Sequence, residues 1–198
     1  MNKKTHRIFG NIIYEYLADN YGIVLNRSGF ILGNISPDLT FSFVVYPHER
    51  EHASGLVKRR IANLIVKDSF NVFDDSFLFS QTLGSLCHYI SDFFCEAHTE
   101  RWNGSLKEHI LCERELYYYT RFHEKEIRES IGEKMPLYPM SAGEIFKEVE
   151  MRNDVYLEGE PSCRAQAEGA VTTCIYVVGS IMAARYALAW NATPGFVH

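Results

Sequence analysis

The sequence predicts an all-α protein, and we expect residues 1–198 to form a single-domain helical bundle. Apolar residues recur at helical intervals through most of the chain, and few stretches alternate with the period of two that is typical of strands. With 198 residues, 46% of them hydrophobic, the chain can bury one sizeable core. No internal repeat is visible that would divide it into modules.

The first half of the chain contains four predicted helices. A short helix and a loop are expected over residues 22–38, where Gly, Asn, Ser and Pro interrupt the apolar pattern. Longer helices are expected over residues 53–66 and 77–97. The first helix, which Thr5 is predicted to cap, is marked by apolar residues at helical spacing: Ile8, Ile12, Ile13, Tyr16 and Leu17.

Three further helices are predicted in the second half. A long helix is expected over residues 106–131, before a linker with two prolines. Ser141 and Glu144 form a capping-box pattern, which predicts a short helix through Met151. The last helix is expected over residues 163–190. Because its uncharged part is about one turn short of the roughly 20 residues that a membrane span needs, we expect a buried core helix and no transmembrane segment.

Charge and cysteine content limit the partner and the compartment. The formal net charge is −5, so the chain lacks the basic footprint typical of nucleic-acid binders, and we expect no stable nucleic-acid partner. Asn11, Glu15 and Asp19 interrupt the apolar residues near the amino terminus, which predicts an amphipathic helix rather than a secretory signal. The five cysteines form no CxxC pair, and reduced core thiols are expected. Together these features predict a cytoplasmic protein.

Two pairs of ionisable residues lie on predicted helices. His88 and Asp92 are four residues apart, and each can face a common ion. His109 and Glu113 repeat this spacing, and His98 lies between the two pairs. Burying such groups costs free energy unless something pairs with them. Because imidazole and carboxylate groups are ligands of zinc and related divalent metals, the spacing predicts a metal site.

This spacing resembles the ligand series of the zinc-dependent bacterial phospholipases C, whose relatives include the single-strand-specific zinc nucleases. The earlier ligands of that family are a histidine near the amino terminus, an aspartate after a loop and a later histidine. Their counterparts here are His6, Asp38 and His52. The family fold is all-α, as the periodicity independently predicts. The series from residue 88 is His88-x3-Asp92-x5-His98-x10-His109-x3-Glu113.

The resemblance implies a cluster of two to three zinc ions and allocates their ligands. A second ion would leave room for water or substrate, and a third would use His6 together with Asp92, which would bridge to the first. The ligands of the first ion would be Asp38, His52, His88 and Asp92, and those of the second His98, His109 and Glu113.

The third ion is the one for which the resemblance is incomplete. In the family this ion also uses the amino and carbonyl groups of an N-terminal tryptophan, and this chain begins Met-Asn-Lys-Lys-Thr before His6. The third site would therefore be empty, weak or completed by a different group. His48 or Glu49, near the loop, is a further candidate.

Clustered zinc ions with bridging carboxylates favour the hydrolysis of phosphoesters. The resemblance implies a phospholipase C-like phosphodiesterase, in which the zinc cluster activates water for in-line attack on phosphorus. We assign Asp38 two roles, as a zinc ligand and as the residue that takes or orients the proton of that water. The expected substrate is a phospholipid headgroup or a soluble phosphomonoester, phosphodiester or nucleotide.

Two alternatives remain open. The residues HEREH, from His48 to His52, fit the zinc metalloprotease signature with Glu49 as general base, although both intervening residues are charged. The chain could also be a non-catalytic, zinc-stabilised helical domain that binds a partner. Structural zinc sites are closed by four protein ligands, whereas the second predicted site has only three, which favours catalysis.

Overall fold

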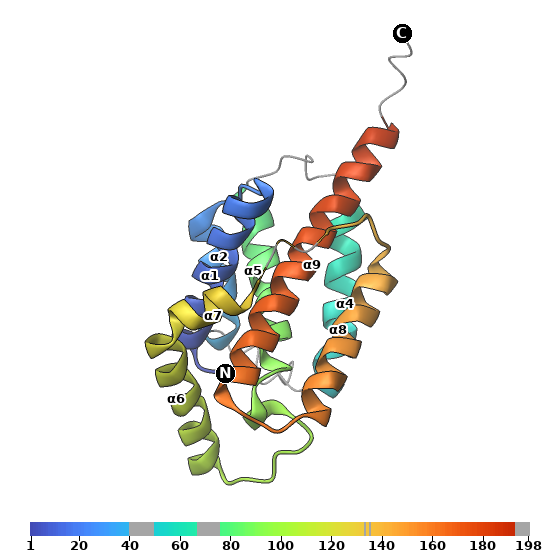
Figure 1. The fold of residues 1–198 in the computed structure, drawn as a ribbon. Helices are drawn as coiled ribbons and strands as arrows, with labels where there is room; N and C mark the ends of the chain where they lie inside the picture. Colours follow the sequence, from blue (N-terminus) through green and yellow to red (C-terminus); the bar gives the residue numbers. More distant parts are fainter. Residues whose placement is uncertain (40–49, 67–75, 133, 135, 193–198) are drawn as a thin grey trace.

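The computed structural model describes residues 1–39, 50–66, 76–132, 134 and 136–192. Within these residues the chain forms eight α-helices and two short 3-10 helices, with no strand (Figure 1), so the predicted all-α class is confirmed. The elements are α1 (Lys3–Tyr21), α2 (Arg27–Ile35), η1 (Ser36–Leu39), α4 (Arg50–Val66), α5 (Phe77–Asp92), η2 (Glu96–His98), α6 (Leu106–Phe122), α7 (Glu124–Ser130), α8 (Ala142–Glu158) and α9 (Cys163–Ala192).

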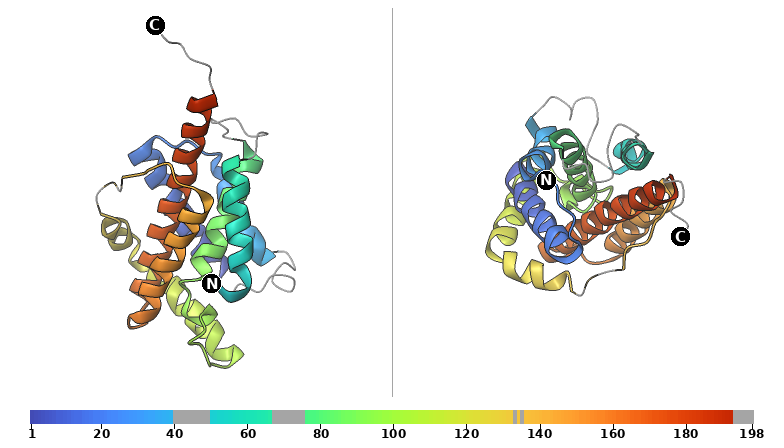
Figure 2. Two further views of the ribbon diagram at one scale, coloured as in Figure 1. Left: turned by 90° about the vertical axis from the view of Figure 1, so that its right-hand side faces the viewer. Right: turned by 90° about the horizontal axis from the view of Figure 1, so that it is seen from above.

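Helix α5 runs through the middle of the bundle, where it packs against α2, α4 and α9. Figures 1 and 2 show α1 and α2 on one side of it and α4, α8 and α9 on the other. The core is built from apolar side chains that these helices bury completely. Among them are Phe79, Leu83, Leu86 and Ile90 from α5 and Val171, Ile175, Val178 and Ile181 from α9.

Helix α9 is the long apolar helix that the sequence predicted at the carboxyl end. By length and composition alone it could cross a membrane, but 67% of its most apolar window is buried inside the bundle. A core helix of a globular protein has the same properties. The end of α9 extends beyond its neighbours (Figure 1), and Trp190 is exposed there.

Helix α1 begins earlier than the sequence predicted. The N-cap is Asn2, whose side-chain oxygen accepts hydrogen bonds from the backbone N–H groups of Lys4 (3.0 Å) and Thr5 (3.2 Å). The prediction that Thr5 caps this helix is therefore wrong, because Asn2 already satisfies the free amides of the first turn. Thr5 is buried within that turn.

Three predicted helix ends are also corrected. The helix predicted over residues 77–97 ends at Asp92, because Phe93, Phe94 and Cys95 each donate a backbone hydrogen bond three residues back, which tightens the chain into a turn. The helix predicted over residues 106–131 is interrupted at His123, which separates α6 from α7. Helix α8 begins at the predicted capping box but continues to Glu158, because its apolar face does so too.

Candidate metal centre

Seven of the eight residues predicted to bind metal come from elements that converge at one end of α5. His6 lies at the end of the first turn of α1, Asp38 lies in η1, and His88 and Asp92 occupy the last two turns of α5. The remaining three are contributed by the neighbouring η2 and α6, as His98, His109 and Glu113. His6, His88 and Asp92 are completely buried.

A first group of ligand atoms comes from His6, Asp38 and His88, all within 4.8 Å of one another. The rings of His6 and His88 are stacked, with centroids 3.9 Å apart. Asp92 lies against both rings, with Oδ1 3.3 Å from His6 Nε2 and Oδ2 3.3 Å from His88 Nε2. Asp38 Oδ1 lies 3.6 Å from the same His88 nitrogen. Two carboxylates and two imidazoles therefore converge in the protein interior.

The orientation of His88 is set by the backbone of α2. His88 Nδ1 donates a hydrogen bond to the carbonyl oxygen of Asn34 (2.9 Å), which leaves Nε2 facing the carboxylates. Metal-binding histidines usually have such a second hydrogen bond, because it fixes the tautomer and the ring plane. Neither ring nitrogen of buried His6 has a hydrogen-bond partner among the described residues. An unsatisfied imidazole beside carboxylates fits a metal ligand.

A second group surrounds the Glu113 carboxylate on α6. Its Oε1 lies 3.0 Å from His98 Nε2 and 3.2 Å from His109 Nε2. The ring centroids of His98 and His109 are 5.0 Å apart, and the rings of Trp102 and His109 are perpendicular, with centroids 6.2 Å apart. The prediction that His109 and Glu113 face a common point from one helical surface is consistent with these distances.

The amino group of Met1 lies between the two groups. Its nitrogen is 2.8 Å from Asp92 Oδ1, 2.9 Å from Glu113 Oε1 and 2.6 Å from His98 Nε2. The Asn2 side chain keeps this end of the chain in place by donating to the backbone oxygen of Glu113 (3.1 Å). A cationic group thus occupies the point at which both groups meet.

The ionisation of the carboxylates and of His98 in the cluster favours the binding of a cation. Burial alone would raise the pKa of the Asp92 carboxyl, but the Met1 amino group and the three surrounding histidines hold that pKa well below its ordinary value. The pKa of Glu113 is also lowered against its burial, chiefly by the hydrogen bond to His98 and by the Met1 amino group. Burial and the same amino group lower the pKa of His98. Ionised carboxylates beside neutral imidazoles are the forms that bind zinc.

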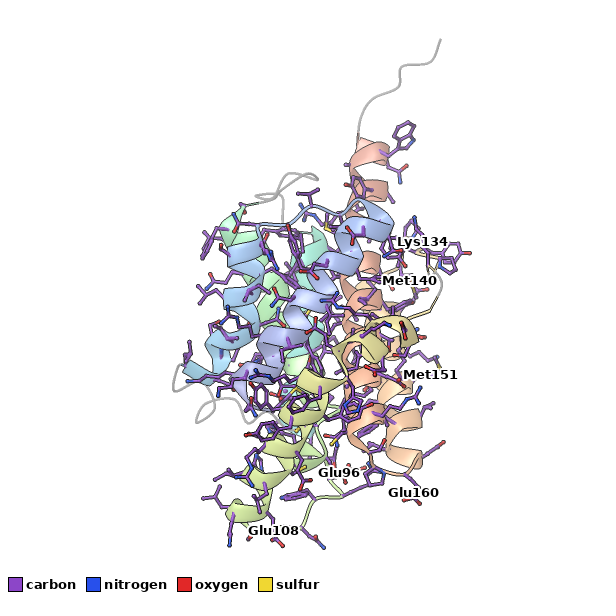
Figure 3. All side chains as sticks on the ribbon, turned by 60° about the vertical axis from the view of Figure 1, so that its left-hand side comes forward. Glu96, Glu108, Lys134, Met140, Met151 and Glu160 are labelled. Carbon is purple, nitrogen blue, oxygen red and sulfur yellow. The ribbon has the colours of Figure 1, made fainter. Side chains whose placement is uncertain are left out.

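The element that carries His98 is held by Glu96. The Glu96 carboxylate accepts hydrogen bonds from Arg101 Nη2 (2.7 Å) and from the Tyr156 hydroxyl (2.9 Å), which join η2 to α8. Figure 3 shows Glu96 in the lower part of the bundle, together with Glu108 at the start of α6. The short element that carries His98 is thus anchored to α8.

A cavity of about 490 Å³ opens beside His98, between α4 and α8. Arg50 lines it, and its Nη1 donates to the side-chain oxygens of Asn153 (3.0 Å) and Asp154. Trp102 contributes an aromatic wall. A metal ion held by His98 would therefore be reachable from solvent through a space lined by Arg50 and by the carboxylates of Glu51, Glu100 and Asp154.

Three of the candidate ligand residues do not join these groups among the described residues. His52 lies on the first turn of α4 with an exposed side chain, and it belongs to neither group of gathered ligand atoms. Its assignment to the first ion stays a prediction. His48 and Glu49, the first two residues of the HEREH pattern, lie outside the described residues.

Sequence reasoning missed three features of this region. Cys95 lies beside His98 and Glu113, although the sequence predicted only a core thiol there. Its spacing, three residues after Asp92 and three before His98, is the signal that could have identified it. The Met1 amino group and the pairing of Arg50 with Asn153 had no local signal, because both depend on tertiary packing.

The comparison with protein families agrees with this geometry. Residues 5–163 match the family model described as zinc dependent phospholipase C. No curated protein and no solved structure matches the chain. The matched range contains every predicted ligand, and most of α9 lies beyond it. The chemistry of the gathered donors, imidazole and carboxylate, fits the zinc that the family description names.

Proposed function

The chain belongs to the zinc-dependent phospholipase C family, and from this premise we propose that it is a zinc-dependent phosphoric ester hydrolase. The observation that supports the proposal is the convergence of buried imidazoles and carboxylates from five separate elements at one end of α5. Seven of the eight predicted ligands take part in this convergence. They are His6, Asp38, His88, Asp92, His98, His109 and Glu113.

Two to three zinc ions are proposed. Asp92 contacts the imidazoles of the first group and also the Met1 amino group. His6, Asp38, His88 and Asp92 would hold zinc on one side, and His98, His109 and Glu113 on the other. The Met1 nitrogen lies where the third site needs a further donor. When bound, zinc lowers the pKa of a coordinated water and neutralises charge on a phosphoryl group.

The chain's own residues are proposed to orient the substrate and to move the proton. Asp38 is only partly buried, and its carboxylate faces His88 Nε2, so it can accept a proton from the attacking water while His88 keeps it in place. Arg50 retains donors that Asn153 and Asp154 do not use, and these suit a phosphoryl oxygen in the cavity beside His98. The substrate is proposed to be a phospholipid headgroup or a small phosphoester, acted on in the cytoplasm.

Hydrolysis of a phosphoester panel by the zinc-loaded protein tests this function. The probes are p-nitrophenyl phosphate, bis(p-nitrophenyl) phosphate and phosphatidylcholine vesicles. We expect turnover of at least one probe, reduced by about 100-fold or more in Asp38→Asn. Asp19→Asn, on the exposed surface of α1, is the matched control and should retain wild-type activity. Full activity in Asp38→Asn would remove that residue from the mechanism.

A second measurement separates this proposal from its alternatives. Zinc content should fall sharply in His88→Ala and His109→Ala but not in His123→Ala, whose imidazole is exposed at the end of α6. Bound zinc without hydrolysis of any probe would favour a zinc-stabilised binding domain. Casein cleavage that Glu49→Gln abolishes would favour the metalloprotease.

A further inference from the structure

The Cys95 thiol occupies a position among the metal-ligand candidates that neither the spacing nor the family comparison assigns to a cysteine. Its sulfur, a ring nitrogen of His98 and a carboxylate oxygen of Glu113 all lie within 4.8 Å of one another. Cys95 is completely buried. Among the described residues its thiol has no hydrogen-bond partner. The sulfur therefore faces the second ligand group and is not engaged elsewhere.

The backbone places this sulfur by two consecutive tight turns. The N–H of Cys95 donates to the carbonyl oxygen of Asp92 (3.0 Å), and the Cys95 carbonyl accepts from the N–H of His98 (2.8 Å). Cys95 is thus tied at both sides to a residue of the centre. A rotation of its backbone would move Asp92 or His98 as well, so the position of the sulfur is determined by the same geometry as the ligands.

The other fully buried cysteines differ in this respect. Cys174 packs in the core with its sulfur 3.4 Å from the backbone oxygen of Cys87 and 3.6 Å from the Ser91 hydroxyl, so its hydrogen-bonding needs are met by the protein. This is the ordinary role of a buried cysteine, as a small apolar residue. Cys95 instead adds a soft donor to an imidazole and a carboxylate, a combination typical of zinc sites.

We propose that Cys95 is a ligand of the metal ion held by His98 and Glu113, so that one ion of the centre has a sulfur in its coordination shell. The inference rests on the proposed metal centre. The thiol loses its proton to solvent when the bond to the metal forms, because the thiolate is the ligand form. His109, whose Nε2 lies 3.2 Å from Glu113 Oε1, would be a further ligand of this ion.

Replacement of zinc by cobalt(II) tests the inference without any substrate. The visible d–d absorption of bound cobalt reports occupancy of the centre, and a sulfur-to-cobalt charge-transfer band in the near ultraviolet reports a thiolate ligand. We expect both signals in the wild-type protein. The charge-transfer band should disappear in Cys95→Ser and persist in Cys174→Ser, an equally buried cysteine with no ligand neighbours.

X-ray absorption of the zinc-loaded wild-type protein gives an answer that depends on no variant. A sulfur scatterer at about 2.3 Å is expected beside nitrogen and oxygen scatterers at about 2.0–2.2 Å. Bound metal with no sulfur scatterer and no charge-transfer band would overturn the role of Cys95 and leave the proposed centre intact. Failure of the wild-type protein to bind either metal would overturn both.

Discussion

The close approach of α2 and α5 is the packing feature on which the first ligand group depends. Gly84 of α5 lies directly against α2, where an added Cβ would be 2.1 Å from the carbonyl oxygen of Phe30. Gly33 of α2 is in the reciprocal position, with its Cβ 2.1 Å from the carbonyl oxygen of Gln81. In both cases the obstructing atom is backbone, so a side-chain rotation cannot relieve the overlap.

The effect of Gly84→Ala follows from these distances. A Cβ does not approach within 3.0 Å of another heavy atom, so the two helices must separate by about 1 Å. The His88 hydrogen bond to the Asn34 carbonyl crosses the same interface at 2.9 Å and would then exceed hydrogen-bonding distance. Overpacking typically costs about 1–3 kcal/mol and an unsatisfied buried group about 1–3 kcal/mol. We expect the free energy of unfolding to fall by about 3 kcal/mol.

Urea unfolding and thermal melting measure this loss. For a chain of this size, about 3 kcal/mol corresponds to a melting temperature lowered by about 6–12 °C. Gly55→Ala is the matched control, because Gly55 lies exposed within α4 and its nearest non-local atom, at 3.9 Å, is the flexible end of Arg59. It should stabilise the protein by up to about 1 kcal/mol. Wild-type stability in Gly84→Ala would refute the reasoning.

Three further outcomes are expected. Asn153→Ala should lower the free energy of unfolding in urea by about 1–3 kcal/mol, because the backbone oxygen of Phe93 loses the buried amide that donates to it (2.7 Å); an unchanged midpoint would contradict this. Ser141→Ala should cost about 0.5–2 kcal/mol through loss of the capping box, with zinc content by mass spectrometry unchanged. The depressed pKa values of Asp92 and Glu113 stabilise the metal-free protein above about pH 4, the ordinary carboxyl range, and this stability is lost as the pH falls. Glu113→Gln should weaken that acid dependence, and an unaltered pH profile would speak against it.

The helices were predictable because their signals are local. Apolar spacing located the described helices, with α6 and α7 predicted as one, and the pattern of Ser141 and Glu144 marked the start of α8. Helix ends were less predictable, because they depend on competition between nearby partners. Thr5 is a good capping residue, but Asn2 precedes it and reaches the same amides. Likewise, no local rule indicated that the chain would turn after Asp92.

The candidate site was predictable only where its residues share a helix. The spacing of His109 and Glu113 brings both to one face, whatever the rest of the fold does. His6 and Asp38 have no such spacing and were identified by resemblance to a family alone. Cys95 was interpreted as a core thiol because most buried cysteines are. Its place beside Glu113 results from the packing of α6 against η2, which the sequence does not indicate.

The charges of the centre argue for cations beyond the one that the chain itself supplies. Three carboxylates, those of Asp38, Asp92 and Glu113, lie in the cluster, and the Met1 amino group is a positive charge in contact with two of them. The low pKa of Asp92 and Glu113 keeps both ionised at neutral pH, in the form that binds a divalent cation. Ionised carboxylates are costly in a low-dielectric interior unless cations neutralise them. The imidazoles of the cluster are further ligands that can retain such ions, and a fold that presents these ligands together gains stability from every ion it binds.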